Sequence, residues 1–166
     1  GTDGGVQIAI DAVRAARHPH QFLGVTEQGL CAIVATSGNP DCHVILRGGA
    51  SGTNYDAVSV QKTTAALVDA KLSPRLMIDT SHGNSDKDYR RQPVASHDIA
   101  EQVVHGDAAI FGVMMESFLV DGRQELKDPA ALRYGQSITD ACMGWEMTVP
   151  VLAELAGAVQ ARRKTR

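Results

Sequence analysis

One histidine and two carboxylates in this sequence stand where apolar segments give way to small polar residues. His82 follows the apolar segment RLMID, Glu116 ends the apolar segment AAIFGVMME, and Asp140 lies in the motif SITDAC. One imidazole and two carboxylates are a suitable ligand set for a divalent metal ion, and their donor atoms are compatible with Mn, Fe, Co or Zn. These three residues therefore form a candidate metal site.

An arginine offers a second kind of binding chemistry. Arg47 ends the apolar segment HVIL and is followed by two glycines. A guanidinium group can hold two phosphate oxygens at once, and glycine lets the backbone approach a ligand closely. Arg47 is therefore a candidate phosphate-binding residue.

Each candidate also has a purely structural interpretation. His82 could be a hydrogen-bonded loop residue, and Glu116 could cap a helix or lie on the surface. Asp140 is a candidate N-cap for the helix that follows it. Arg47 could pair with a neighbouring carboxylate, and Cys142 could be either a further ligand or a small buried thiol. The spacing alone leaves both kinds of interpretation open.

The elements that must position these side chains alternate between strands and helices. Apolar strands are predicted at 43–49, 75–79 and 108–116, and amphipathic helices at about 4–17, 54–72, 92–105 and 147–163. Asp3 is a candidate cap of the first helix. This alternation is typical of an α/β fold with a parallel sheet covered by helices. The carboxyl ends of such strands meet at one rim, where we expect Arg47, His82 and Glu116 to gather.

Two further segments differ from this alternating pattern. Residues 21–26 and 30–36 are rich in β-formers and are joined by a short link that contains Gly29, which predicts a β-hairpin over 21–36. Residues 117–139 are polar and contain glycine and proline, so no element is predicted there.

Length, charge and cysteine content limit the class of protein. The 166 residues suit a single domain, 1–166, with one core. The net charge of −3, without blocks of like charge, speaks against nucleic acid as a partner. No apolar run approaches the ~20 residues of a membrane span. The three cysteines Cys31, Cys42 and Cys142 are widely spaced, which favours a reducing cytoplasm over a disulfide framework.

Several long motifs occur in an order typical of one enzyme family. They are GTDG, TSGNPDCHVILRGG, NYDA, MIDTSHGNSDKDYRRQ, GVMMESFLVDGRQ, YGQSITDAC, GWE and AVQARR. Along its whole length the sequence resembles the microbial class I 3-deoxy-D-arabino-heptulosonate 7-phosphate synthases. The resemblance implies a (β/α)8 TIM barrel that condenses phosphoenolpyruvate with erythrose 4-phosphate and releases phosphate, in the first step of the shikimate pathway.

The resemblance also implies roles for individual residues. It makes His82, Glu116 and Asp140 ligands of one divalent metal ion, together with a cysteine that none of the three cysteines here resembles. It makes Arg47 the residue that binds the phosphoenolpyruvate phosphate. Asp140 would also contact a sugar hydroxyl, so His82, Asp140 and Arg47 are the expected catalytic residues. Asp79 is expected to orient His82.

A complete barrel of this kind needs roughly 200 residues or more. We therefore expect this chain to be the C-terminal part of a synthase, with about the last three strands and the last four helices. The resemblance places the cysteine ligand, a Lys-Pro-Arg-Thr segment for erythrose 4-phosphate and an active-site lysine outside this sequence. The chain alone is expected to be inactive, and the complete protein is expected to be a homo-oligomer.

The hairpin at 21–36 is expected to be regulatory. In the family such an insertion helps to form the site of an aromatic amino-acid feedback inhibitor, and the resemblance places Phe22 and Gly24 there. Gly24 leaves room beside the inhibitor, which favours tyrosine over phenylalanine.

Two other functions remain possible from the sequence. The chain could be a non-catalytic half-barrel that self-associates through its open sheet edges. It could also be a metal-dependent aldolase or hydrolase that uses the same rim, and an assay with phosphoenolpyruvate and erythrose 4-phosphate would separate this last function from the synthase.

Overall fold

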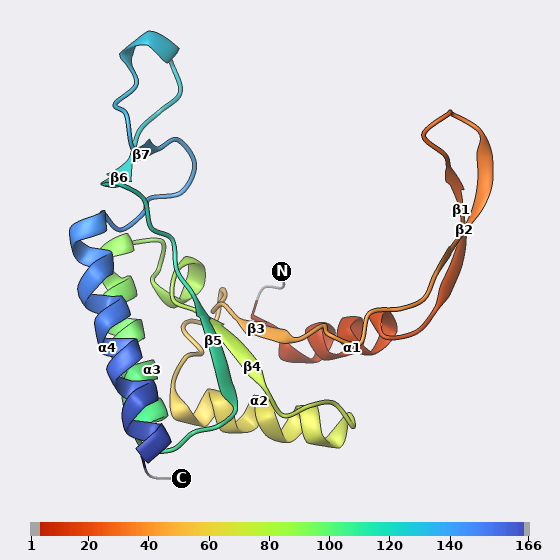
Figure 1. Ribbon diagram of the computed structural model, residues 1–166, viewed down its shortest axis with the longest axis horizontal. Coiled ribbons are helices and arrows are strands. Elements are labelled where there is room, and N and C mark those ends of the chain that lie inside the picture. Colours follow the sequence, from red (N-terminus) through yellow and green to blue (C-terminus); the bar gives the residue numbers. More distant parts are fainter. Residues whose placement is uncertain (1–3, 165–166) are drawn as a thin grey trace.

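A three-stranded parallel sheet forms the centre of the molecule in a computed structural model, which describes residues 4–164. Its strands are β3 (Val44–Leu46), β4 (Leu76–Asp79) and β5 (Ile110–Met114), in the order β3-β4-β5. Val44 is aligned with Leu76, and Asp79 with Met114. The parallel order confirms the α/β prediction, and it brings the residues that follow β3, β4 and β5 to one rim (Figure 1).

Four helices supply the covering layer. They are α1 (Val6–Ala16), α2 (Ala57–Asp69), α3 (Gln92–Val104) and α4 (Trp145–Lys164). Helices α3 and α4 lie side by side, and α1 packs against β3 and α2 (Figure 1). All four helices contribute to one core, whose buried apolar residues include Ile10, Val44, Leu46, Val60, Leu67, Leu76, Ile78, Ile99, Ile110 and Ala158. Each large side chain buried there contributes about 1.5–3 kcal/mol.

Helices cover one face of the sheet only. Along β3 the side chains of Val44 and Leu46 are buried, whereas Ile45 between them is 43% exposed. Phe111 on β5 is also exposed. The predicted barrel is therefore not closed within the described residues: three strands and four helices form an open segment of an α/β layer.

The helix ends agree with their local sequences. Asp56 caps α2, because its side chain accepts hydrogen bonds from the backbone N–H of Ser59 at 3.0 Å and from its hydroxyl at 2.7 Å. Helix α1 begins at Val6 with Gly5 at the N-cap position. The predicted cap Asp3 lies outside the described residues. No helix in the described part of the chain is long and apolar enough to cross a bilayer.

The predicted hairpin is present. Strands β1 (His20–Val25) and β2 (Cys31–Thr36) pair antiparallel, with Phe22 opposite Val34 and Gly24 opposite Ala32. Gly29 has a φ of +79°, which glycine adopts without strain, so it permits the turn between them. The hairpin extends away from the sheet as an arm (Figure 1).

The polar stretch 117–139 contains strands that the sequence did not predict. Strand β6 (Val120–Arg123) pairs parallel with β7 (Gln136–Ser137), and a short 3-10 helix η3 (Pro129–Ala131) lies between them. Both strands lie beyond the carboxyl end of β5 (Figure 1). Two more short 3-10 helices, η1 (His82–Asn84) and η2 (Tyr89–Arg91), connect β4 to α3.

Candidate metal centre

The imidazole of His82 is held by the residues that end β4. Its Nδ1 lies 2.7 Å from Oδ2 of Asp79 and 2.8 Å from the hydroxyl of Ser81. Ser81 in turn donates to Oδ1 of Asp79 from both its hydroxyl (2.7 Å) and its backbone N–H (2.8 Å). The carboxylate of Asp79 is nearly fully buried and fixes one edge of the ring. The other ring nitrogen, Nε2, is left facing Glu116, with 3.6 Å to Oε1.

The backbone around His82 is strained and tightly packed. His82 has a φ of +48°, which few side chains other than glycine tolerate without cost. The loop after β3 packs against it, since a Cβ on Gly48 would lie 2.5 Å from the carbonyl carbon of Gly83. The buried side chain of Asn84 binds the same two loops, donating to the carbonyls of Leu46 and Asp79. Two glycines thus bring the Arg47 and His82 loops into backbone contact.

Glu116 is positioned from α3. The side chain of Gln92, in the first turn of that helix, accepts from the backbone N–H of Glu116 at 2.9 Å and donates to its carbonyl at 3.1 Å. Gln92 is not among the site residues predicted from the sequence. Its only signal there is a polar residue at the start of an amphipathic helix, which normally indicates exposure rather than complete burial.

Asp140 reaches the site through a short backbone ladder. The N–H of Met143 donates to the carbonyl of Glu116 (2.9 Å), and the N–H of Phe118 donates to the carbonyl of Met143 (2.9 Å). Asp140 is carried by the residues just before this ladder. Because α4 begins only at Trp145, Asp140 is not its N-cap, and that structural interpretation is wrong.

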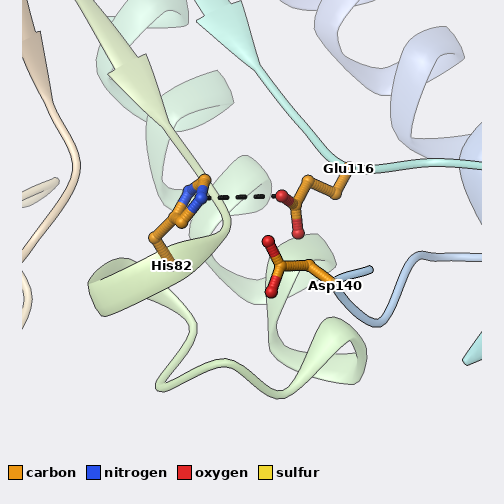
Figure 2. Close-up of side chains that lie close together, drawn as sticks. All are labelled: His82, Glu116 and Asp140. Carbon is orange, nitrogen blue, oxygen red and sulfur yellow. Dashed lines mark ion pairs between the residues drawn. The ribbon is translucent and has the colours of Figure 1, made fainter. Parts of the chain in front are cut away.

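The three predicted metal ligands converge on one point. Figure 2 shows the side chains of His82, Glu116 and Asp140 turned toward one another. One possible ligand atom from each lies within 4.8 Å of those of the other two. Together with Ser85, Lys87 and Ala141 they line a small recess at the carboxyl ends of the strands.

The groups around this recess have opposing effects on the pKa of Glu116. Burial raises the pKa of Glu116 above its ordinary value, and the carboxylates of Asp140 and Asp79 raise it further. His82 and Arg47 act in the opposite direction but do not cancel these effects. A site that disfavours the charge of its own carboxylate stabilises an added cation, so this electrostatic arrangement fits a divalent metal ion.

Arg47 directly follows β3 and therefore lies at the same rim. No ion pair that the structure shows between residues 4 and 164 involves Arg47, so the interpretation as half of an ion pair gains no support. Cys142 is partly buried, and burial raises the pKa of its thiol. Cys142 does not belong to the group of potential metal ligands formed by His82, Glu116 and Asp140. This agrees with the interpretation of Cys142 as a small thiol with a structural role.

The predicted effector residues are not near this recess. Phe22 and Gly24 alternate with Leu23 along β1 and so share one face of the hairpin arm, which extends away from the sheet (Figure 1). Phe22 contributes to a surface hollow at the base of the arm, together with residues of the link to β3. The structure therefore separates the effector candidates from the metal candidates.

A larger cavity lies at the opposite rim of the sheet. It is lined by residues that include Arg17, His43, Arg75 and Phe111. The rings of His43 and Phe111 are nearly perpendicular, with 4.8 Å between their centroids, and Arg75 lies over the ring of Phe111. Asp41, Cys42 and His43 also line this cavity, but among the described residues their ligand atoms do not converge as those of His82, Glu116 and Asp140 do.

Comparisons with known proteins give this geometry its context. A model of the DAHP synthetase I family matches residues 1–153. This chain belongs to that family. A tyrosine-inhibited phospho-2-dehydro-3-deoxyheptonate aldolase of Schizosaccharomyces pombe is 54% identical over 170 residues. A Phe-sensitive enzyme of the same name from Escherichia coli is 52% identical over 163 residues.

The chain spans less than half the length of these family members. The alignments cover 99% and 98% of this chain but only 45% and 46% of the two relatives. A solved structure of the phospho-2-dehydro-3-deoxyheptonate aldolase from Francisella tularensis superposes with a TM-score of 0.91 at 50% identity. That match covers 98% of this chain and 47% of the solved one. The open α/β segment therefore corresponds to part of a DAHP synthase structure.

Proposed function

We propose that this chain forms the C-terminal part of the catalytic domain of a 3-deoxy-D-arabino-heptulosonate 7-phosphate synthase. The enzyme would condense phosphoenolpyruvate with erythrose 4-phosphate and release phosphate. The observation that carries this proposal is the convergence of His82, Glu116 and Asp140 at the rim that also bears Arg47, in a chain of the DAHP synthetase I family.

The donor set suits one divalent metal ion such as Mn, Fe, Co or Zn. His82 would bind through Nε2, because Asp79 occupies Nδ1, and Glu116 and Asp140 would bind through carboxylate oxygens. When bound, the metal would supply Lewis-acid polarisation of the aldehyde oxygen or activation of water. A fourth ligand, a cysteine, would come from a part of the protein outside this sequence.

The remaining steps use side chains of this chain to hold the reactants. Arg47 would bind the phosphate of phosphoenolpyruvate and offset its charge, which matters because two phosphorylated substrates must approach each other. C3 of phosphoenolpyruvate would then form a bond to the aldehyde carbon of erythrose 4-phosphate. Water would add at C2, and phosphate would leave by cleavage of the C–O bond. Asp140 would also contact a hydroxyl of the sugar.

Regulation would reside in the hairpin of β1 and β2. We propose that Phe22 and Gly24 contribute to a site for an aromatic amino acid, with tyrosine favoured. The relatives include tyrosine-inhibited and phenylalanine-inhibited enzymes at similar identity, 54% and 51%, so overall identity does not choose between the two effectors. The free cysteines Cys31, Cys42 and Cys142 suit the reducing cytoplasm proposed for the enzyme.

The proposal is tested by substituting His82 in the full-length synthase. We expect His82→Ala to reduce turnover of phosphoenolpyruvate with erythrose 4-phosphate to the level of the wild type in excess EDTA, because the imidazole ligand is lost. The matched control is His105→Ala, since His105 lies at the far end of α3 and hydrogen-bonds to the carbonyl of Glu101. Activity of His82→Ala that is near normal and insensitive to EDTA would refute the assignment.

A further inference from the structure

Gln92 is a buried amide whose hydrogen bonds all lead toward the metal candidates. Its side chain is in the first turn of α3 and is 0% exposed. Besides the two bonds to the backbone of Glu116, its Oε1 lies 3.4 Å from the hydroxyl of Thr80. A buried amide needs partners for both its oxygen and its nitrogen, and Gln92 finds them on the residues that follow β4 and β5.

The carbonyl of Glu116 extends this arrangement to Asp140. It accepts from Gln92 Nε2 on one side and from the backbone N–H of Met143 on the other. Met143 is fully buried and follows Asp140 by three residues. One amide side chain therefore connects the three segments that carry the three metal candidates: Thr80 is close to His82 in sequence, Glu116 is bound directly, and Met143 is bound through the same carbonyl.

We infer that Gln92 is a positioning residue that sets the spacing of the three metal ligands. The inference rests on the proposed metal site and adds a role for a residue that contacts neither metal nor substrate. Without the amide, the N–H of Glu116 and one acceptor site of its carbonyl lose their partner in a partly buried place. The Glu116 backbone would then shift, and its carboxylate would no longer lie within reach of His82 and Asp140.

Gln92→Met tests this directly, because methionine fills a similar volume and can neither donate nor accept these bonds. In the full-length synthase we expect the Kd for Mn²⁺, measured by the EPR signal of free Mn²⁺, to rise about 10-fold or more, as for other partners of metal ligands. With Co²⁺ in place of Mn²⁺ we expect a changed visible absorption spectrum, because the ligand geometry changes. Loss of stability alone would not alter that spectrum in the folded fraction.

Ser96→Ala is the matched control. Ser96 is on the same helix, one turn further on, equally buried, and its hydroxyl has no hydrogen-bond partner in the described part of the chain. The control should bind Mn²⁺ and Co²⁺ as the wild type does. If Gln92→Met does not fold, Gln92→Glu retains the shape and the acceptor for the N–H of Glu116 but loses the donor to its carbonyl, and a changed Co²⁺ spectrum is again expected.

The outcomes separate this inference from the proposed function. A folded Gln92 variant with wild-type Kd and wild-type Co²⁺ spectrum would overturn the positioning role while leaving the metal site intact. A wild-type protein that binds neither Mn²⁺ nor Co²⁺ would overturn the proposed function itself.

Discussion

The orientation of His82 depends on groups that are not metal candidates themselves. Asp79 and Ser81 occupy one edge of the imidazole ring. His82 itself adopts a left-handed backbone conformation at φ +48°, which is energetically unfavourable for a residue other than glycine. The geometry after β4 therefore restricts the ring to presenting Nε2 toward Glu116. A histidine on an ordinary exposed loop would lose this orientation to side-chain entropy.

Removal of the Arg47 side chain should weaken the binding of phosphoenolpyruvate more than that of erythrose 4-phosphate. We expect Arg47→Ala in the full-length synthase to raise the KM for phosphoenolpyruvate by about 10- to 100-fold, the equivalent of a lost charge-assisted hydrogen bond of about 1.5–3 kcal/mol. The KM for erythrose 4-phosphate should change much less. Initial-rate kinetics with each substrate varied in turn measures both values.

Arg90→Ala is the control for loss of one positive charge. Arg90 follows the same strand as His82 but lies over the ring of Tyr89, on η2, and is exposed. It should leave both KM values close to those of the wild type. If Arg47→Ala raises the KM values for both substrates equally, that result would count against Arg47 as the residue that binds the phosphate of phosphoenolpyruvate.

The sequence predicted the metal candidates and missed the residue that holds one of them. His82, Glu116 and Asp140 could be predicted because each combines a ligating side chain with a recognisable motif. The role of Gln92 depends on the backbone of Glu116, 24 residues away in sequence, and no local pattern encodes such a contact. Asp79 lies between these cases, since its distance of three residues from His82 made the contact a reasonable prediction.

At the scale of elements, the close contact between the β3 and β4 loops is the feature that places Arg47 near the metal candidates. Gly48 has a φ of +66°, and a Cβ there would meet the backbone of Gly83 and Asn84 at 2.5–2.6 Å. Neither backbone can move without disturbing the rim. Glycine at this position is therefore required both by conformation and by space.

Gly48→Ala should accordingly lower stability and disturb phosphate binding together. We expect a fall in the free energy of unfolding of at least about 1–2 kcal/mol from the left-handed conformation alone, and a raised KM for phosphoenolpyruvate. Thermal unfolding and initial-rate kinetics measure the two effects.

Gly52→Ala is the control for strain without contact. Gly52 also has a positive φ, +114°, but a Cβ there would meet nothing within 4 Å. It should lower the unfolding temperature while leaving the KM for phosphoenolpyruvate unchanged. If Gly48→Ala leaves that KM unchanged as well, the loop contact does not position Arg47.

The hairpin offers a separate test of regulation. A Cβ on Gly24 would lie 2.7 Å from Cγ2 of Val34, so Gly24→Ala must push that side chain along the face that bears Phe22. We expect this variant to raise the tyrosine concentration needed for half-inhibition several-fold while kcat stays unchanged. Inhibition curves with tyrosine and phenylalanine measure the effect.

Leu23→Ala is the matched control, because Leu23 is the neighbouring residue on the opposite face of the arm and is 85% exposed. Its inhibition curve should follow that of the wild type. An unchanged response of Gly24→Ala to both amino acids would remove Gly24 from the proposed effector site.

The hairpin and the alternating elements were predictable, whereas β6 and β7 were not. The hairpin has two β-rich runs and a glycine between them. By contrast, β7 is only Gln136–Ser137, and two polar residues give no alternating pattern. The pairing of β6 with β7 depends on the positions of β5 and α4, which hold the chain on either side. A local sequence pattern does not contain such a tertiary contact.

At the scale of the whole molecule, the sheet has one covered face and one open face. Ile45 and Phe111 on the open face are large apolar side chains that solvent reaches. Burying a fully exposed side chain of this size contributes about 1.5–3 kcal/mol. Ile45 is 43% and Phe111 38% exposed, so a further layer or further strands would add less than half of that value for each residue. This arrangement agrees with the proposal that the chain is one part of a barrel.

The 166-residue chain alone should therefore show no synthase activity. We expect no release of phosphate from phosphoenolpyruvate and erythrose 4-phosphate above the background rate, because a proposed cysteine ligand and a substrate segment are absent from this sequence. The purified chain is compared with the full-length synthase at equal molar concentration in the presence of Mn²⁺. Turnover by the chain alone would contradict the assignment of those groups to the rest of the protein.

Gly48 and Gly83 also have a thermodynamic consequence. Because their backbones are in contact, we expect the loop that bears Arg47 and the loop that bears His82 to share one conformational equilibrium. An anion at Arg47 that shifts this equilibrium changes the affinity for the metal by some factor, and the metal must then change the affinity for the anion by the same factor. The two proposed ligands of this rim are therefore expected to bind as a coupled pair, and the coupling factor is the same whichever of them is added first.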